Sequence, residues 1–147
     1  MTSIPKALAG QKIALDTMVF IYAFEEHPAY VSLLRAFFFA LEKGDVEAVT
    51  STITITECLT LPYRKGDFGL AAQYMVLFRN FPHLSVNPVT DDIAERAAFL
   101  RSRYRITTPD ALQVATAVLS ESKVFLTNDE NLARVKDLHV LTLSEFV

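Results

Sequence analysis

The stretch "KIALDTMVFIYAF", residues 12–24, contains the first repeating unit of the fold. Its first part, KIALD, is a short apolar run that ends in an acid, Asp16, and predicts a β-strand. Its second part begins the longer segment TMVFIYAFEEHP, residues 17–28, which predicts a short helix that stops before Pro28. A strand followed directly by a helix is the building unit of α/β proteins, so the remaining sequence should repeat it.

The same alternation continues along the chain. Further strands are predicted at residues 46–51 (VEAVTS), 84–89 (LSVNPV), 123–127 (KVFLT) and, as a possible fifth, 139–143 (HVLTL). Helices are predicted at residues 30–44, 68–81 and 90–105, and a last one begins in ITTPDALQVATAV, residues 106–118, with Thr108 as N-cap and Pro109 at the first helical position. This pattern predicts an α/β fold with a mostly parallel sheet of four to five strands, covered on both faces, in a single domain of 147 residues.

One segment supports two interpretations. In STITITECLTLPYRKG, residues 51–66, the alternation of Thr and Ile favours a strand by its period and its β-branching. The position of the segment between a strand and a long helical region favours a helix. We predict a helix from Thr52 to Arg64, with Pro62 disturbing its end.

Composition narrows the classes of function. Hydrophobic residues make up 51% of the chain, which suffices for a core, yet no apolar run reaches the roughly 18 residues that cross a bilayer. The first ten residues lack the features of a signal peptide, and the single cysteine, Cys58, fits a reducing compartment, so we expect a cytoplasmic protein without membrane contact. The net charge of −3 excludes binding of nucleic acid by bulk positive charge. Any such contact would need local basic patches or a bound cation.

Four acids follow the predicted strands or begin a helix. Asp16 closes the first strand, Glu57 comes shortly after the second, Asp110 begins the last helix, and Asp129 follows the fourth strand. If the strands are parallel, all four can meet at one edge of the sheet. Carboxylates a few Å apart repel one another, and a hard divalent cation such as Mg²⁺ removes the conflict. Such an ion can also activate a water for attack on a phosphodiester.

Each acid also has a purely structural interpretation. Asp16 and Asp129 could cap the segments that follow them, Asp110 could interact with the dipole of its helix, and Glu57 could close a capping box with Thr54. The chain has 17 acids, so four of them are easily selected by chance, and spacing alone leaves both interpretations open.

Four segments, LDTMVFIYAF, TITECLTLPYRKG, TPDALQVATAV and VFLTND, resemble in this order the signature segments of PIN-domain nucleases. The resemblance is closest to the VapC-type ribonuclease toxins of bacterial and archaeal toxin–antitoxin pairs, and it extends from about Lys12 to Leu141. It implies a three-layer α/β/α fold around a parallel sheet. It also implies an acidic pocket that holds Mg²⁺ or Mn²⁺ and cleaves RNA.

The resemblance also assigns roles to individual residues. It implies that Asp16 and Asp110 are the chief metal ligands, that Glu57 and Asp129 complete the catalytic site, and that Thr127 and Asn128 line the same pocket. It further implies an RNA substrate, an antitoxin protein as partner, and a homodimer.

Basic and aromatic clusters each allow two interpretations. The basic residues could contact the RNA backbone or could be ordinary solvated side chains; they are Arg64, Lys65, Arg101, Arg103 and Arg105. Three consecutive aromatics, Phe37–Phe39, point in three directions on a helix, so at least one can meet a partner unless the helix is enclosed within the domain.

The function we expect is that of a metal-dependent endoribonuclease acting as the toxin of a type II toxin–antitoxin pair. Two rivals stand beside it. A housekeeping PIN nuclease would process RNA without an antitoxin, and a non-catalytic α/β module would bind RNA or a protein without cleaving anything.

Overall fold

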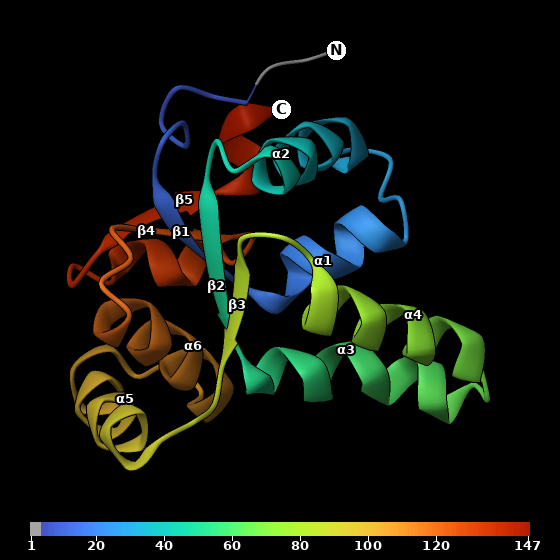
Figure 1. Ribbon diagram of the computed structural model, residues 1–147. Coiled ribbons are helices and arrows are strands. Elements are labelled where there is room, and N and C mark those ends of the chain that lie inside the picture. The colour runs from blue at the N-terminus through green and yellow to red at the C-terminus, as the bar shows by residue number, and fades with distance from the viewer. Residues whose placement is uncertain (1–3) are drawn as a thin grey trace.

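Five parallel strands form the centre of the molecule (Figure 1). The computed structural model describes residues 4–147. The strands are β1 (Lys12–Leu15), β2 (Glu47–Ser51), β3 (Leu84–Asn87), β4 (Val124–Thr127) and β5 (His139–Thr142). They lie in the order β3-β2-β1-β4-β5, and every neighbouring pair is parallel. The predicted sheet is therefore confirmed, including its possible fifth strand.

Helices cover both faces of this sheet. They are α1 (Thr17–Phe24), α2 (Val31–Lys43), α3 (Thr52–Arg64), α4 (Phe68–Asn80), α5 (Asp91–Tyr104) and α6 (Thr108–Leu119), with two short 3₁₀ helices, η1 (Glu130–Arg134) and η2 (Leu143–Phe146). In Figure 1, α5 and α6 lie together on one side of the strands, and α1 to α4 lie on the other. The three-layer α/β/α arrangement is therefore present. No helix within residues 4–147 is both long enough and apolar enough to span a membrane.

Alternating side chains of the strands divide the core into two parts. Ile13 and Leu15 of β1 are buried in a cluster with residues of α1 to α4, whereas Ala14 between them is buried in a cluster with residues of α5 and α6. Successive side chains of a strand point to opposite faces, so a sheet covered on both sides needs apolar residues at every position. That requirement explains the apolar runs IAL of β1 and VFL of β4.

The ambiguous segment forms the predicted helix. Helix α3 spans Thr52–Arg64, and Ser51 is its N-cap, with a hydroxyl that accepts a hydrogen bond from Ile53 N at 3.2 Å. Thr54 and Cys58, four residues apart, are both buried. That spacing is the period of a helix face, and the burial of Cys58 shows that this cysteine behaves as a small core residue.

The start of α6 differs from the prediction by one residue. Thr107, and not Thr108, is the N-cap, and its hydroxyl accepts from Asp110 N at 3.3 Å. Pro109 therefore occupies the second helical position. Because the first four N–H groups of a helix have no partner within the helix, proline is compatible with either position and does not fix the start.

The Phe37–Phe39 run meets three different environments. Phe37 is fully buried, and Phe38 packs against its ring with the centroids 5.5 Å apart. Phe39 is 43% exposed, and the Lys43 ammonium lies 4.9 Å from its ring centroid. The run therefore belongs mainly to the core, with Phe39 exposed and Phe38 partly buried at the wall of a surface pocket.

The topology places β1 and β4 side by side at the centre of the sheet. The chain proceeds from β1 through β2 to β3, then returns to the other side of β1 with β4 and continues to β5. Strands β1 and β4 thus border the point at which the direction of winding reverses, where ligands of open α/β sheets bind beyond the carboxyl ends of the strands. Leu15 pairs with Leu126, so Asp16 and Thr127 emerge together at this edge.

Candidate functional site

Asp16 lies directly after β1 and is the N-cap of α1. Its backbone N–H donates to Leu126 O of β4 at 3.0 Å. Its Oδ1 accepts from Thr17 N at 2.8 Å, and its Oδ2 accepts from the Thr127 hydroxyl at 2.7 Å. The carboxylate is therefore held by the first residue of α1 and the last residue of β4, while each of its oxygens keeps a further lone pair for a ligand.

Burial makes the Asp16 carboxyl hard to ionise. The residue is 8% exposed, and the loss of hydration raises its pKa from 3.8 to about 6 although its two hydrogen bonds lower it. The negative charges of Asp110 and Glu57 raise this pKa further. Asp16 is therefore close enough to two other predicted site residues to feel their charge.

Asp110 stands in the first turn of α6 and is half-buried. Burial raises the pKa of its carboxyl, and the charges of Asp129 and Glu57 raise it as well. Charges in solvent interact appreciably only over short distances. Hydrogen bonds of Thr17 and Thr127 connect Asp16 to Glu57 and to Asp129, and these charge effects put Asp110 in the same neighbourhood.

Asp129 and Asn128 extend from the end of β4. Asp129 is the N-cap of η1, and its backbone N–H donates to Thr127 Oγ1 at 3.0 Å. Thr127 thus donates its proton to Asp16 and accepts the N–H of Asp129. The Asn128 amide turns toward α1, where Nδ2 donates to the Tyr22 hydroxyl at 3.3 Å. Of the two predicted polar pocket residues, Thr127 contacts the acids directly.

Glu57 is exposed on α3 and is tied to the site by Thr17. The Thr17 hydroxyl donates to Glu57 Oε1 at 2.6 Å. The alternative of a capping box between Glu57 and Thr54 is wrong, because Ser51 caps this helix and the Thr54 hydroxyl is engaged in a buried network.

Gln113 anchors that buried network from α6, three residues after Asp110. Its side chain is 2% exposed, and its Nε2 lies 3.1 Å from Thr17 Oγ1 and 2.7 Å from Thr54 Oγ1. An amide nitrogen has two protons, so it can donate to both hydroxyls at once. Gln113 thereby connects α6 to α1 and α3 directly beneath the acids.

The shorter contacts assign the hydroxyl protons of this network, and the longer contact of 3.2 Å between the Thr17 and Thr54 hydroxyls is then left without a proton. Thr50 Oγ1 donates to Leu15 O at 2.9 Å, so the contact of 2.8 Å between Thr50 and Thr54 must use the Thr54 proton. The Thr17 proton goes to Glu57, and both Thr17 and Thr54 accept from the Gln113 amide. The result is a rigid polar network whose outer end is the Glu57 carboxylate.

Sequence reasoning did not select Thr17 or Gln113. Both carried a usable signal. Thr17 directly follows Asp16 at the start of a helix, and Gln113 is the one long polar side chain in the apolar run ALQVATAV. A long polar residue on a buried helix needs hydrogen-bond partners, which points to a polar interior.

Within residues 4–147, none of the four acids forms an ion pair. Over residues 4–147, the ion pairs join Arg35 to Glu26 at 2.9 Å and Lys43 to Asp45 at 3.1 Å, both on the surface. The negative charge of the site is therefore not balanced by any lysine or arginine of the described chain. Uncompensated carboxylates are the condition under which a cation would bind.

The five predicted basic contacts are all exposed. Two of them have structural partners: Arg101 Nε donates to Ile106 O at 3.0 Å, and the Arg103 guanidinium lies 5.8 Å from the ring centroids of both Phe99 and Tyr104. Across residues 4–147, no hydrogen bond or ion pair connects any of the five to the four acids.

The donor set of the site suits Mg²⁺ or Mn²⁺. It consists of carboxylate and hydroxyl oxygens, which these ions prefer. Among the described residues, no three His, Cys, Asp or Glu side chains are arranged closely enough to hold an ion by themselves. Mg²⁺ usually takes only one or two carboxylates directly and keeps several waters, so Asp16 and Asp110 would suffice, and the residues present fit the ion.

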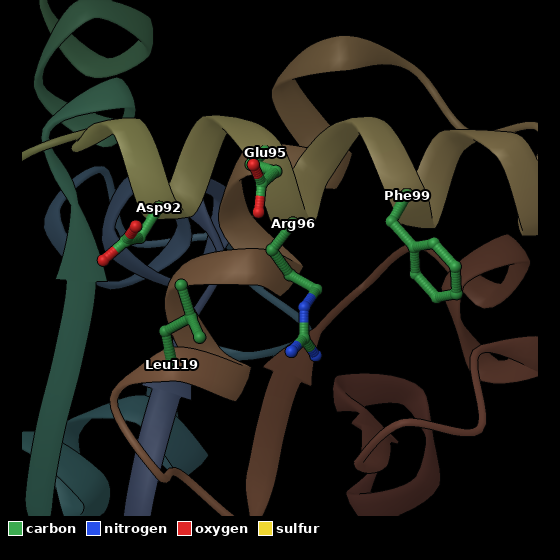
Figure 2. Close-up of a pocket in the computed structure, with 5 residues that line it drawn as sticks. All are labelled: Asp92, Glu95, Arg96, Phe99 and Leu119. Atoms are coloured by element: carbon green, nitrogen blue, oxygen red, sulfur yellow. The ribbon is translucent and has the colours of Figure 1, made fainter.

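A pocket of about 560 Å³ lies elsewhere, between α5 and the end of α6 (Figure 2). It is lined by Asp92, Glu95, Arg96 and Phe99 from α5 and by Leu119. Leu119 follows Asp110 by nine residues, roughly 13 Å along the helix axis. This pocket contains none of the predicted site residues and stands apart from the acids.

Comparison with known proteins gives one family. The family model described as the PIN domain matches residues 13–138. No curated protein sequence matches the chain.

Several solved structures are similar in fold. VapBC2 from Rickettsia felis, bound to a DNA fragment from its promoter, has a TM-score of 0.69 and 17% identity, over 89% of this chain and 98% of that chain. A toxin–antitoxin complex from Klebsiella pneumoniae has a TM-score of 0.66 and 22% identity, over 89% and 97%. VapC20 of Mycobacterium tuberculosis, described as a toxin that cleaves the Sarcin-Ricin loop, has a TM-score of 0.64 and 18% identity, over 77% and 86%.

Proposed function

The chain belongs to the PIN domain family, and on that basis we propose that it is a metal-dependent endoribonuclease that hydrolyses phosphodiester bonds in RNA. The observation that carries the proposal is the neighbourhood of four carboxylates at the carboxyl ends of β1 and β4, where burial and mutual repulsion raise the pKa of Asp16 and Asp110. Perturbed pKa values cluster at functional sites, and this clustering supports the proposal.

The proposed ligands of the ion are Asp16 and Asp110, with Glu57 and Asp129 completing the site. When bound, Mg²⁺ or Mn²⁺ would neutralise the charge of the phosphodiester and favour attack by water. The protein's own groups provide orientation. Thr127 and the N–H of Thr17 hold the Asp16 carboxylate, and the Thr17 hydroxyl holds Glu57. This preorganised shell keeps the negative charges in place without further rearrangement.

We further propose that the nuclease is the toxin of a toxin–antitoxin pair. The similar solved structures include toxin–antitoxin complexes from Rickettsia felis and Klebsiella pneumoniae, which supports an antitoxin as partner. Two adjoining apolar pockets of about 400 and 160 Å³ share Phe24, Leu77 and Phe81. They give such a partner an apolar surface to cover. A cytoplasmic location and a homodimer complete the proposal.

The decisive experiment measures cleavage of RNA by the wild type, Asp16→Asn and Asp110→Asn, each with Mg²⁺, with Mn²⁺ and with EDTA. Asp92→Asn, which changes an exposed acid of α5, is the matched control. We expect cleavage by the wild type and the control only, and only with a divalent ion. Equal cleavage by all four proteins, or cleavage in EDTA, would reject the metal-dependent site.

Expression tests separate the toxin from a housekeeping nuclease. We expect the wild type alone to arrest growth, Asp16→Asn to be harmless, and co-expression of the product of a small neighbouring gene to relieve the arrest. Harmless wild-type expression together with metal-dependent cleavage of RNA would instead favour the housekeeping function.

A further inference from the structure

Three aromatic rings gather where α1 meets α2, outside the four acids. The rings of Tyr22 and Tyr30 stack with centroids 5.2 Å apart and planes 13° from parallel. The imidazole of His27 contacts both, with centroid distances of 4.5 Å to Tyr22 and 4.9 Å to Tyr30. All three residues are only partly buried. We call this group the Tyr22–His27–Tyr30 cluster.

The cluster is attached to the edge of the acidic site. The Tyr22 hydroxyl accepts the hydrogen bond from Asn128 Nδ2, and Asn128 lies between Thr127 and Asp129. Tyr22 stands on α1, the helix whose N-cap is Asp16. Side chains of a helix lean toward its N-terminus, so the Tyr22 ring leans toward the end of α1 that carries Asp16.

The surroundings of the cluster suit an uncharged, flat ligand. The two acids that precede His27 are both engaged, because Glu25 accepts the Tyr74 hydroxyl at 2.7 Å and Glu26 pairs with Arg35. The His27 Nδ1 accepts from Ala29 N at 3.1 Å, so the neutral ring carries its proton on Nε2 as a donor. The cluster thus combines ring surface with hydrogen-bond donors at His27 Nε2 and at the two tyrosine hydroxyls.

We propose that the Tyr22–His27–Tyr30 cluster stacks a nucleobase of single-stranded RNA next to the phosphodiester held at the acids. This inference rests on the proposed function and adds a base-binding subsite to it. Proteins recognise unpaired RNA bases by stacking them on aromatic side chains, and each stacked base changes affinity by about tenfold to a hundredfold. Because the three rings already pack against one another, little side-chain entropy would be lost when RNA binds.

The test measures affinity for fluorescein-labelled RNA by fluorescence anisotropy, in Ca²⁺, which is also bound by oxygen ligands. One oligonucleotide is intact, and the others each carry a single abasic residue at successive positions. For the wild type, we expect one abasic position to weaken binding by about tenfold to a hundredfold. Tyr30→Leu should bind the intact RNA about as weakly as the wild type binds that abasic RNA, and should no longer distinguish the two.

Control variants separate a lost ring from a lost fold. Tyr30→Phe keeps the ring and should bind as the wild type does. Tyr63→Leu removes a half-exposed tyrosine at the distal end of α3 and should also leave affinity unchanged. His27→Leu is a second change within the cluster and should weaken binding of the intact RNA. Thermal unfolding of each variant verifies that it is folded.

The outcomes distinguish this inference from the function on which it rests. If folded Tyr30→Leu and His27→Leu bind intact RNA as tightly as the wild type, or keep the same sensitivity to the abasic position, the cluster only connects α1 to α2 and the inference fails. Cleavage of the intact RNA with Mg²⁺ is measured in parallel. If cleavage is absent while the base-dependent affinity is present, the proposed nuclease fails and the base subsite stands.

Discussion

Asp16 and Asp110 are the two proposed metal ligands, yet the structure holds them in opposite ways. Asp16 is buried between β1 and β4, and both its carboxylate oxygens accept hydrogen bonds from neighbouring residues. Asp110 is half-buried in the first turn of α6, and its backbone N–H is bound by Thr107. The difference indicates one ligand that is fixed before any ion arrives and one that has room to adjust.

The largest expected effect on RNA cleavage comes from lengthening each ligand by one methylene. The two variants should lose activity to very different extents if the two carboxylates are held differently. In Asp16→Glu the longer side chain has no space and cannot keep both hydrogen bonds, so RNA cleavage should fall on the order of 10³-fold. Asp110→Glu has solvent on one side and should retain activity within about tenfold of the wild type. Single-turnover rates in Mg²⁺ measure both. Equal losses in the two variants would show that the ligands are held alike.

The second largest expected effect is on the pH dependence of the unfolding free energy, to which the buried carboxyl of Asp16 should contribute. The folded-state pKa of Asp16, about 6, lies above its ordinary value of 3.8, so folding favours the protonated form. In metal-free protein the resulting stability is fully present below about pH 3.8 and is lost as the pH rises through 6. At about 1.4 kcal/mol per pKa unit, Asp16 contributes about 3 kcal/mol of this change.

Denaturant unfolding at several pH values in EDTA measures that contribution. The wild type should gain more unfolding free energy than Asp16→Asn when the pH is lowered from 7.5 to 4.5. If the unfolding free energies of the two proteins change in parallel with pH, the Asp16 carboxyl is not shielded from water in the folded state.

Replacing Gln113, which anchors the buried polar network, should have a smaller effect on stability and cleavage. Gln113→Leu deprives Thr17 and Thr54 of a donor and loosens the link to Glu57, which should lower the unfolding free energy by about 1–3 kcal/mol and slow cleavage. Gln73→Leu changes an exposed glutamine of α4 and is the matched control. Urea unfolding compares them, and a Gln113 variant as stable and active as the control would reject the role of the network.

The smallest effect concerns the exposed arginines. Arg103 packs near the rings of Phe99 and Tyr104, and no contact links it to the acids. If it meets the RNA backbone, Arg103→Gln should weaken RNA binding only a few-fold, and the salt dependence of binding should decrease by about one unit of slope. An unchanged salt dependence would assign Arg103 to the surface of α5 alone.

The fold could be predicted well from the sequence because its signals are local. Continuous apolar runs predicted the central strands, and position along the chain favoured the helix at Thr52–Arg64 over a strand, with bounds that the structure confirms. The exact start of α6 could not be predicted, because two adjacent threonines, Thr107 and Thr108, are both capable caps and proline tolerates either register.

The candidate site could be predicted only in part. The four acids stand at strand and helix ends, where parallel topology gathers them, so their neighbourhood follows from the order of elements. The contacts from Gln113 to Thr17 and Thr54 join residues 96 and 59 positions apart in the chain. Such a network depends on the packing of α6 against α1 and α3, which no local pattern encodes.

Binding of Mn²⁺ at pH 7.5, measured by electron paramagnetic resonance, tests the central claim most directly. The account predicts that the wild type and Asp92→Asn bind the ion alike, whereas Asp16→Asn binds it at least about tenfold more weakly. A wild type that binds no Mn²⁺, or an Asp16→Asn variant that binds it as tightly as the wild type, would contradict the claim that these acids form a metal site.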